Sequence, residues 1–303
     1  MNILITGATG KIGKIILSEL VVTGQFKIFA LLHNDKKTEN YSGIQICRGD
    51  MSDLASLRNA MKDIGTIDTV LHLAAVTHAN NKVEYYSVNL EGTKNLLKVS
   101  EEIGIKRIIF LSSRAACTGG GDYAESKLAA ENEIKKSKLK WLILALGETY
   151  STNGKDEINR LYKLIKNHYF IPIIGKGEYK LAPVYIEDAA QAIINSLTSD
   201  DNLSGKSYVI CGPEELSYIE LVTLIINFMR VKRQVVNIPL ILLKFIFWLA
   251  SIFKTNIIAY DQLDRLTVAK PSDISKARKD LVFNPRKVSE ALKLFESATK
   301  VRH

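Results

Sequence analysis

The chain has 303 residues, 47% of them hydrophobic, and its 41 basic and 32 acidic residues give a formal charge of +9. This size and composition are typical of one large globular domain or two lobes. The Lys and Arg residues are scattered, and no basic stripe is interleaved with aromatic residues, so the sequence argues against nucleic-acid binding.

The cysteines are few and widely spaced: Cys47, Cys117 and Cys211. An odd number without metal-ligand spacing argues against both a disulfide framework and a metal site. A reducing, cytoplasmic compartment fits this usage. Met1 runs almost directly into the first expected strand, which leaves no room for a signal peptide.

Short apolar runs alternate with helical patterns along the first half of the chain. This alternation predicts an α/β fold with a doubly wound parallel sheet that is covered on both faces. The expected strands are residues 3–6, 28–32, 44–47, 69–73, 107–111, 141–146 and 207–211. The clearest expected helices are residues 11–22 and 187–197.

Between the first expected strand and the first expected helix lies TGATGKIG, with Gly7, Gly10 and Gly13. In this context the first glycine permits a tight turn and the second lets the backbone approach a pyrophosphate. The third lets helix and strand pack closely. We therefore expect a dinucleotide site at this loop, at the N-terminus of the helix. Its expected cofactor-binding residues are Gly7, Thr9, Gly10, Lys11, Ile12 and Gly13.

The third expected strand is followed by CRGDMSD. The carboxylate of Asp50 and the main chain of Met51 are expected to hold an adenine edge at this position. The alternative is that Asp50 or Asp53 merely caps the next helix, for which Asp53 is the better candidate.

The end of the second expected strand, ALLHNDKK, bears on the choice of cofactor. NAD binding usually places an acidic residue there for the ribose 2′-hydroxyl, whereas NADP binding places a basic residue. His33 and Asn34 occupy the edge, and Lys36 and Lys37 follow. NADP is therefore slightly favoured over NAD.

The segment from Ser113 to Lys127 contains the expected reaction chemistry. Tyr123 and Lys127 are four residues apart and share one helix face. A cationic lysine beside a phenol lowers its pKa, so that Tyr123 can act as an acid or base near neutral pH. Ser113 is placed to hydrogen-bond the reacting oxygen. Tyr162 and Lys166 have the same spacing, but they do not follow a strand that ends in serine, so we read that match as accidental.

Taken together these motifs resemble the extended, epimerase/dehydratase-like branch of the short-chain dehydrogenase/reductase superfamily. The matching segments are TGATGKIG, GDMSD, LHLAAV (71–76), VNLEGTKNLL (88–97), the serines at 112–113, YAESK (123–127) and PVYIEDAAQAI (183–193). The resemblance implies that Leu73, Ala74 and Ala75 line the cofactor and that Asn89 supports the active site. It also implies that Lys127 binds the nicotinamide ribose and that His72 is structural.

The fold and motifs together set the expected domain boundaries. Residues 1–150 and 184–211 are expected to form the dinucleotide-binding Rossmann domain. Residues 151–183 and 212–303 are expected to form a smaller, mostly helical substrate lobe over the carboxyl ends of the strands.

The sequence also departs from the resembled branch. Sugar-nucleotide members commonly have Arg-Pro where Ala145 and Leu146 stand, and Arg-Asp where Leu181 and Ala182 stand. These departures leave three functions open. The first is an NAD(P)-dependent epimerase, dehydratase or dehydrogenase that moves a hydride to or from a secondary alcohol or ketone, such as that of a nucleotide-linked sugar. The second is a reductase of a more apolar ketone, similar to steroid or flavonoid reductases. The third is a non-catalytic NADP-binding sensor or complex subunit.

The expected partners are a small-molecule substrate and, as an open alternative, a second copy of the chain in a homodimer. The apolar stretch IPLILLKFIFWLASIF, residues 238–253, is interrupted by Lys244 and is shorter than the roughly 20 residues that span a bilayer. We expect it to form a buried or surface-docked helix. An interfacial membrane helix is the alternative that we do not favour.

Overall fold

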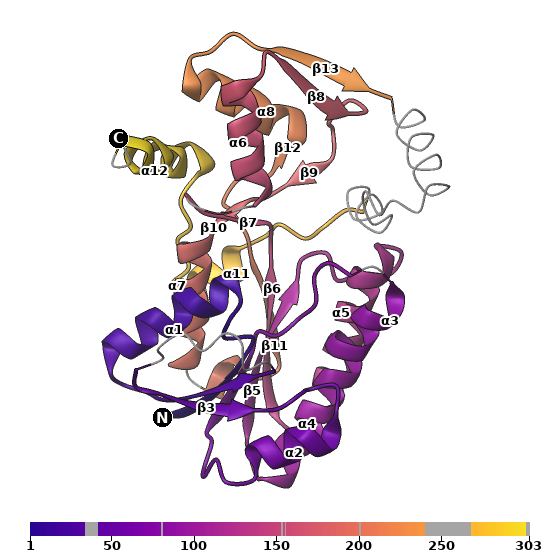
Figure 1. Cartoon of the computed structure of the whole chain (residues 1–303), viewed down its shortest axis with the longest axis vertical. Helices are drawn as coiled ribbons and strands as arrows, with labels where there is room; N and C mark the ends of the chain where they lie inside the picture. The colour runs from indigo at the N-terminus through magenta and orange to yellow at the C-terminus, as the bar shows by residue number, and fades with distance from the viewer. Residues whose placement is uncertain are drawn as a thin grey trace.

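The computed structural model describes residues 1–33, 42–79, 81–152, 154, 156–199, 201–239 and 268–300. Seven strands form one parallel sheet in the order β3-β2-β1-β4-β5-β6-β11, which is the doubly wound arrangement that the sequence predicts (Figure 1). The strands are β1 (Asn2–Thr6), β2 (Lys27–Leu32), β3 (Ile44–Arg48), β4 (Thr69–His72), β5 (Arg107–Ser113), β6 (Lys140–Leu146) and β11 (Lys206–Ile210).

Both faces of this sheet are covered by helices, because its strands are apolar on both sides. In β1, Ile3 and Ile5 belong to one hydrophobic core and Leu4 belongs to the other, as the two-residue period of a strand requires. The core that contains Ile3 includes residues of α1 (Lys11–Thr23), α7 (Ile186–Leu197) and α11 (Ser275–Asp280). The core that contains Leu4 includes residues of α2 (Leu54–Met61), α4 (Gly92–Glu102) and α5 (Gly121–Lys136).

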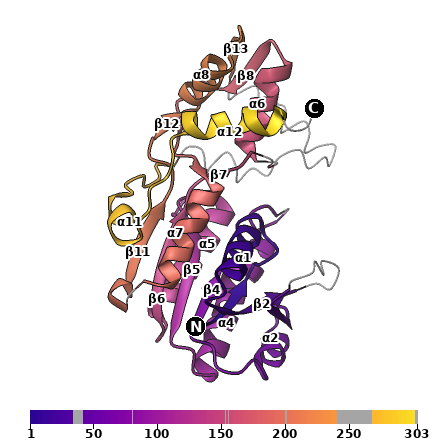
Figure 2. The ribbon, with the colours of Figure 1, turned by 90° about the vertical axis from the view of Figure 1, so that its left-hand side faces the viewer.

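A second, smaller lobe lies beyond the carboxyl ends of the strands (Figures 1 and 2). Its core packs α6 (Glu157–Asn167), α8 (Tyr218–Met229) and α12 (Val288–Lys300) against short strands. The paired strands are β7 (Thr149–Tyr150) with β10 (Val184–Tyr185), β8 (Phe170–Ile174) with β13 (Gln234–Ile238), and β9 (Lys180–Leu181) with β12 (Leu216–Ser217). The lobe that we expected to be mostly helical therefore also contains three two-stranded sheets. Two further short elements are α3 (Lys82–Tyr85) and the 3-10 helix η3 (Asp201–Leu203).

The segment that contains α11 packs with the large sheet rather than with the second lobe. Ile274, Ala277, Leu281 and Phe283 are buried in the same core as β1 and α7. The hydroxyl of Tyr208 on β11 donates to Asp280 at 2.6 Å. Our sequence expectation assigned all of residues 212–303 to the lobe. We propose instead that the chain returns to the dinucleotide-binding domain at residues 274–283 before it enters α12.

Most of the apolar stretch 238–253 lies outside the described residues; only Ile238, the last residue of β13, and Pro239 are described. Asn34, Lys36 and Lys37 also lie outside them. No helix in the described part of the chain is long and apolar enough to cross a membrane.

Candidate functional site

The glycine-rich loop connects β1 to α1 at the carboxyl edge of the sheet. Gly7 has a φ of 72°, and a Cβ atom there would lie 2.5 Å from the main-chain nitrogen of Ala74. A Cβ atom on Gly13 would lie 2.4 Å from the carbonyl oxygen of Gly7. Glycine is therefore required at Gly7 for a left-handed turn against the next loop, and at Gly13 for close packing of α1 on the loop.

The N-terminus of α1 is suited to an anionic group. Gly10 is its N-cap residue and offers no side-chain cap, and the first turn contains no acidic residue. The first N–H groups of a helix have no partner within it, and the helix dipole favours negative charge there. The loop thus fits a pyrophosphate. Thr9, Lys11 and Ile12 flank Gly10 on this segment.

His33 and Asp50 lie together where β2 and β3 end. His33 Nδ1 is 3.6 Å from Asp50 Oδ2, and Asp50 Oδ1 accepts hydrogen bonds from the main chain and hydroxyl of Ser52. Partial burial raises the pKa of Asp50, but the Ser52 hydrogen bonds and His33 outweigh this effect and lower it. Met51 is buried against Gly92, and Asp53 caps α2 by accepting from Ala55 N, as expected.

His72 is a structural residue in this fold. Its Nδ1 atom is 2.7 Å from Thr6 Oγ1 and its Nε2 atom is 3.0 Å from Thr93 Oγ1. Complete burial, together with the nearby charge of Lys127, lowers the pKa of His72 to about 3, so the ring is neutral. Thr6 Oγ1 also accepts from Ala74 N at 3.2 Å, which fixes the loop that contains the expected cofactor-lining residues Leu73, Ala74 and Ala75.

Asn89 connects that loop to the helix of Tyr123. It lies buried in a π-helix, η2 (Tyr86–Glu91), and π-helical turns are often found at functional sites. Its side-chain oxygen accepts from Val76 N at 2.8 Å, and its amide nitrogen donates to Ser126 Oγ at 3.0 Å. The Ser126 hydroxyl donates in turn to the carbonyl of Tyr123 at 2.8 Å. Asn89 therefore joins the loop after β4 to the first turns of α5.

Lys127 extends from α5 into the protein interior. Its Nζ atom donates to the carbonyl oxygen of Leu111 at 2.9 Å and lies 4.1 Å from the centroid of the Phe110 ring. The side chain is almost completely buried, and burial lowers its pKa to about 7, against a smaller opposing effect of Glu131. Since its contacts are on β5, Lys127 reaches the strand that ends at Ser113.

Ser113 and Tyr123 both lie at this end of β5. Ser113 is the last residue of the strand, and its hydroxyl oxygen accepts from Ala115 N at 3.1 Å. Tyr123 lies in the first turn of α5, half-buried, with its ring centroid 5.9 Å from that of the buried Tyr85. The fold therefore places Ser113, Tyr123 and Lys127 on one strand and the helix that follows it.

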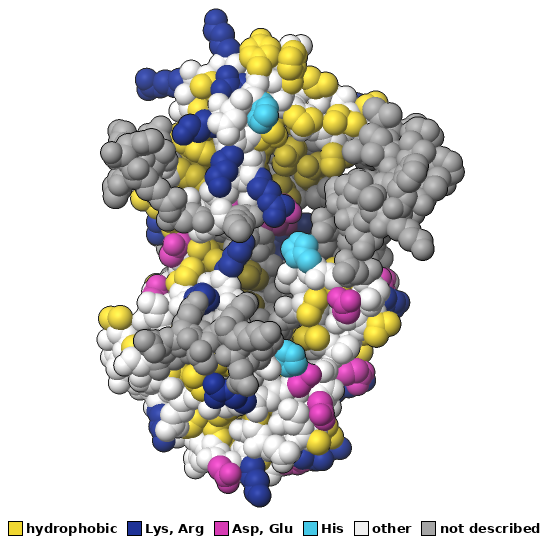
Figure 3. All heavy atoms as spheres, viewed as in Figure 1, with side chains coloured by type: hydrophobic (Ala, Val, Ile, Leu, Met, Phe, Trp, Pro, Cys, Tyr) yellow, Lys and Arg dark blue, Asp and Glu magenta, His cyan; other side chains and the backbone are white. Residues whose placement is uncertain are grey.

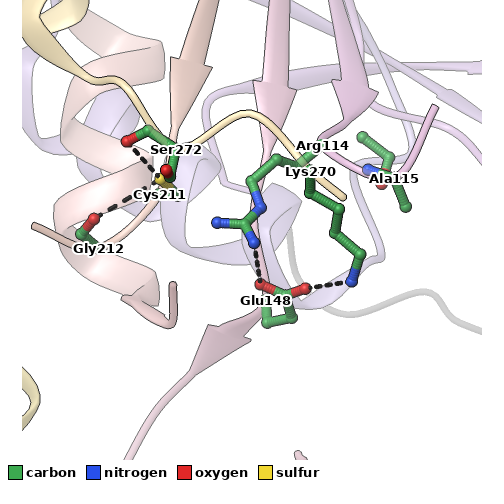
Figure 4. Close-up of polar contacts among 8 residues, drawn as sticks. Arg114, Ala115, Glu148, Cys211, Gly212, Lys270 and Ser272 are labelled. Atoms are coloured by element: carbon green, nitrogen blue, oxygen red, sulfur yellow. Dashed lines mark hydrogen bonds and ion pairs between the residues drawn. The ribbon is translucent and has the colours of Figure 1, made fainter. Parts of the chain in front are cut away.

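A buried charged cluster, which the sequence reasoning missed, includes Arg114, the residue that follows Ser113 in the chain (Figure 4). Lys270 Nζ is 2.8 Å from Glu148 Oε1, and an Arg114 guanidinium nitrogen is 3.8 Å from Glu148 Oε2. The exposed fractions of the Arg114, Lys270 and Glu148 side chains are 1%, 8% and 28%. No guanidinium nitrogen of Arg114 has a hydrogen-bond partner among the described residues. The signal that could have found the cluster is an arginine immediately after an apolar strand, where a charge needs a partner.

The second Tyr-x-x-x-Lys match lies elsewhere. Tyr162 is on α6 in the second lobe, half-buried, with its ring centroid 5.2 Å from that of Phe295. Leu181, at the position where sugar-nucleotide relatives commonly have arginine, is buried in the same lobe core. Neither residue offers a charged or titratable group to a ligand at the edge of the large sheet.

Comparisons with known proteins agree with this arrangement. The family model described as "NAD dependent epimerase/dehydratase family" matches residues 3–211. The chain belongs to this family. Its members' cofactor is a nicotinamide dinucleotide, and the epimerase/dehydratase chain is accordingly an NAD(P)-dependent enzyme whose substrate the family does not specify.

Among its relatives is a mitochondrial subunit of Arabidopsis thaliana, "NADH dehydrogenase [ubiquinone] 1 alpha subcomplex subunit 9". It is 24% identical over 77% of the chain and 59% of the relative. A second is the dTDP-D-glucose 4,6-dehydratase of Mus musculus, 24% identical over 76% of the chain and 73% of the relative. Among solved structures, UDP-glucose 4-epimerase of Thermotoga maritima with UDP-glucose matches with a TM-score of 0.76, 19% identity and full coverage of both chains. This last match shows that the epimerase/dehydratase chain shares the fold.

Proposed function

We propose that the chain oxidises or reduces a secondary alcohol or ketone of a nucleotide-linked sugar, as an epimerase or dehydratase does. The observation that carries this proposal is the contact of Lys127 with β5, which joins the helix of Tyr123 to the strand that ends at Ser113. The names of two similar proteins, a dTDP-D-glucose dehydratase and a UDP-glucose epimerase, support the substrate class.

In this mechanism each residue of the site has a separate role. When bound, the nicotinamide cofactor supplies or accepts the hydride. Tyr123 moves the proton at the substrate oxygen, and Ser113 hydrogen-bonds that oxygen and orients it. Lys127 favours the ionised phenol and holds the ribose, as the resemblance implies. Gly7, Gly10 and Gly13 leave room for the pyrophosphate at the N-terminus of α1.

A more apolar ketone is the second candidate substrate. The observation that favours it is that Leu181 is buried in the lobe core, so that position offers no cation to a nucleotide phosphate. Ala145 and Leu146 likewise offer none at the end of β6.

The test is a thermal-shift screen in the presence of NADP or NAD, followed by product detection. Nucleotide sugars form one arm and apolar ketones the other, because a bound ligand raises the melting temperature by mass action. Stabilisation and turnover confined to nucleotide sugars would support the proposal. Turnover confined to apolar ketones would replace it with the second candidate. Cofactor binding without any turnover would favour a non-catalytic role, such as that of a complex subunit.

A further inference from the structure

The sheet of β8 and β13 exposes a face at the outer end of the second lobe that is mostly apolar and includes one polar residue, Gln234, opposite Phe170. Ile171 and Ile173 point into the lobe core, and the alternate residues Phe170 and Pro172 are exposed. Val236 pairs with Pro172 in parallel register, so it lies on the same outer face, and it is 40% exposed. Phe170 is 60% exposed, and exposed aromatic residues in such a patch need a physical reason.

Basic residues border this face. Lys163 and Lys166 lie in the second half of α6, and Arg230 and Lys232 lie in the turn between α8 and β13; all four are exposed. The guanidinium of Arg233 donates to the carbonyl oxygens of Ile165 and Lys166, which joins this turn to the end of α6. These contacts bring two segments, distant in sequence, to one basic border.

The patch and its border form a surface that we call the lobe tip. It consists of Lys163, Lys166, Tyr169, Phe170, Pro172, Arg230, Lys232 and Val236.

The lobe tip contains no acidic residue. Residues 158–177 and 221–260 include no Asp or Glu, although the chain as a whole has 32. Within the part of the chain that the structure describes, Lys163, Lys166, Arg230 and Lys232 form no ion pair. On the face seen in Figure 3, the upper end of the lobe shows basic and hydrophobic side chains and no acidic ones. Such a segregated charge is unlike an ordinary mixed surface.

We propose that the lobe tip docks on the surface of an anionic lipid bilayer. Phe170, Tyr169 and Val236 would enter the boundary between headgroups and acyl chains, while the basic border contacts anionic headgroups. Aromatic rings are enriched at that depth of the membrane.

Two other occupants fit the surface less well. A second copy of the chain would bring the same uncompensated basic border against itself across a two-fold axis, and like charges repel. A nucleic acid would satisfy the cations, but it would leave the aliphatic side chains Pro172 and Val236 without an apolar environment.

The test is flotation of the full-length protein with lipid vesicles. We expect binding to vesicles of phosphatidylcholine with phosphatidylglycerol, little binding to phosphatidylcholine alone, and a loss of binding as salt is raised. The double variant Lys163→Glu/Lys166→Glu should lower the affinity for anionic vesicles about tenfold or more. Lys62→Glu/Lys106→Glu changes the net charge equally on the other domain and should bind like the unmodified protein. Circular dichroism and the melting temperature check that each variant is folded.

Phe170→Ser tests the apolar half of the proposal. This variant keeps every charged residue. It should bind anionic vesicles more weakly than the unmodified protein at moderate salt, where the electrostatic attraction is partly screened. Equal binding to neutral and anionic vesicles would overturn the proposal, and so would equal binding of the tip variant and its charge-matched control. An absence of vesicle binding, with binding to a DNA duplex that the tip variant abolishes, would assign the surface to nucleic acid instead.

Discussion

Lys127 Nζ donates a hydrogen bond of 2.9 Å to the carbonyl oxygen of Leu111, so the middle of α5 is held against the carboxyl-terminal half of β5. Because Tyr123 lies one turn earlier on α5 and Ser113 lies two residues beyond Leu111, one contact supports both. A charged lysine in this position lowers the stability of the fold, since its ammonium group is buried against the Phe110 ring.

That loss of stability predicts a specific pH dependence. Burial lowers the pKa of Lys127 to about 7, whereas an unfolded lysine has its usual pKa of 10.5. Between these values the unfolded state binds more protons, so the free energy of unfolding should rise with pH. Urea unfolding across this range should show a steeper rise with pH in the wild type than in Lys127→Met. The difference between the two proteins removes the effect of other titrating groups, and parallel curves would contradict the prediction.

Tyr123→Phe should separate cofactor binding from catalysis. The substitution keeps the ring that packs near Tyr85 and removes only the hydroxyl. Turnover should fall about a hundredfold or more, the usual size of general acid–base catalysis, while calorimetry should show nearly unchanged affinity for NAD(P).

Tyr162→Phe is the matched control for that variant. It has the same Tyr-x-x-x-Lys spacing, but it lies in the core of the second lobe, so turnover should not change. If Tyr123→Phe and the wild type turn over equally, Tyr123 does not transfer the proton.

The large sheet and the glycine loop could be predicted because local patterns decide them. Apolar runs predicted all seven strands of the large sheet to within two residues at each end, and Gly7 stands where φ is 72°. Asp53 could be predicted as the N-cap residue of α2, because it stands directly before the helix.

Other features depend on contacts between distant residues. Glu148 and Lys270 are 122 positions apart, and no local pattern pairs them. β8 and β13 are likewise joined only in the folded lobe. Residues 274–283 pack against the large sheet through Phe283 and its apolar neighbours. The sequence shows these residues only as scattered apolar positions, so their place in this core could not be predicted.

Gly10→Val should abolish cofactor binding with little effect on folding. A Cβ atom at Gly10 would lie 3.1 Å from the carbonyl oxygen of Gly7, so the loop must shift by a few tenths of an ångström to accept it. The valine side chain would occupy the approach to the N-terminus of α1. Calorimetry with NADP and NAD, beside a melting curve, checks both statements. Gly7→Ala is the contrast, because its Cβ would lie 2.5 Å from Ala74 N, and this variant should lose stability.

The same calorimetry tests which cofactor is preferred. The sequence favours NADP, since His33 stands at the end of β2 where NAD binding usually requires an acidic residue. Tighter binding of NAD than of NADP to the wild type would overturn that preference.

The Glu148 carboxylate neutralises two buried cations, Arg114 and Lys270. Glu148→Gln should therefore destabilise the protein more than the removal of either cation. Burial raises the pKa of Glu148, but Lys270 and Arg114 outweigh that effect and lower it. The neutral amide would leave Arg114 and Lys270 buried without an anion, at a cost of about 3–5 kcal/mol. Arg114→Met should cost less, because Glu148 keeps its 2.8 Å contact with Lys270.

The sign of the pH effect follows from the lowered pKa. The contribution of Glu148 is present above the carboxyl's unfolded pKa and is lost as pH falls through its lower folded pKa. Urea unfolding should therefore show a weaker loss of stability in acid for Glu148→Gln than for the wild type. A Glu148→Gln protein within about 0.5 kcal/mol of the wild type at neutral pH, the range of ordinary surface substitutions, would show that the cluster does not stabilise the fold. Ser113 ends β5 directly before Arg114, so turnover measured beside stability would then show whether the cluster acts only by positioning that serine.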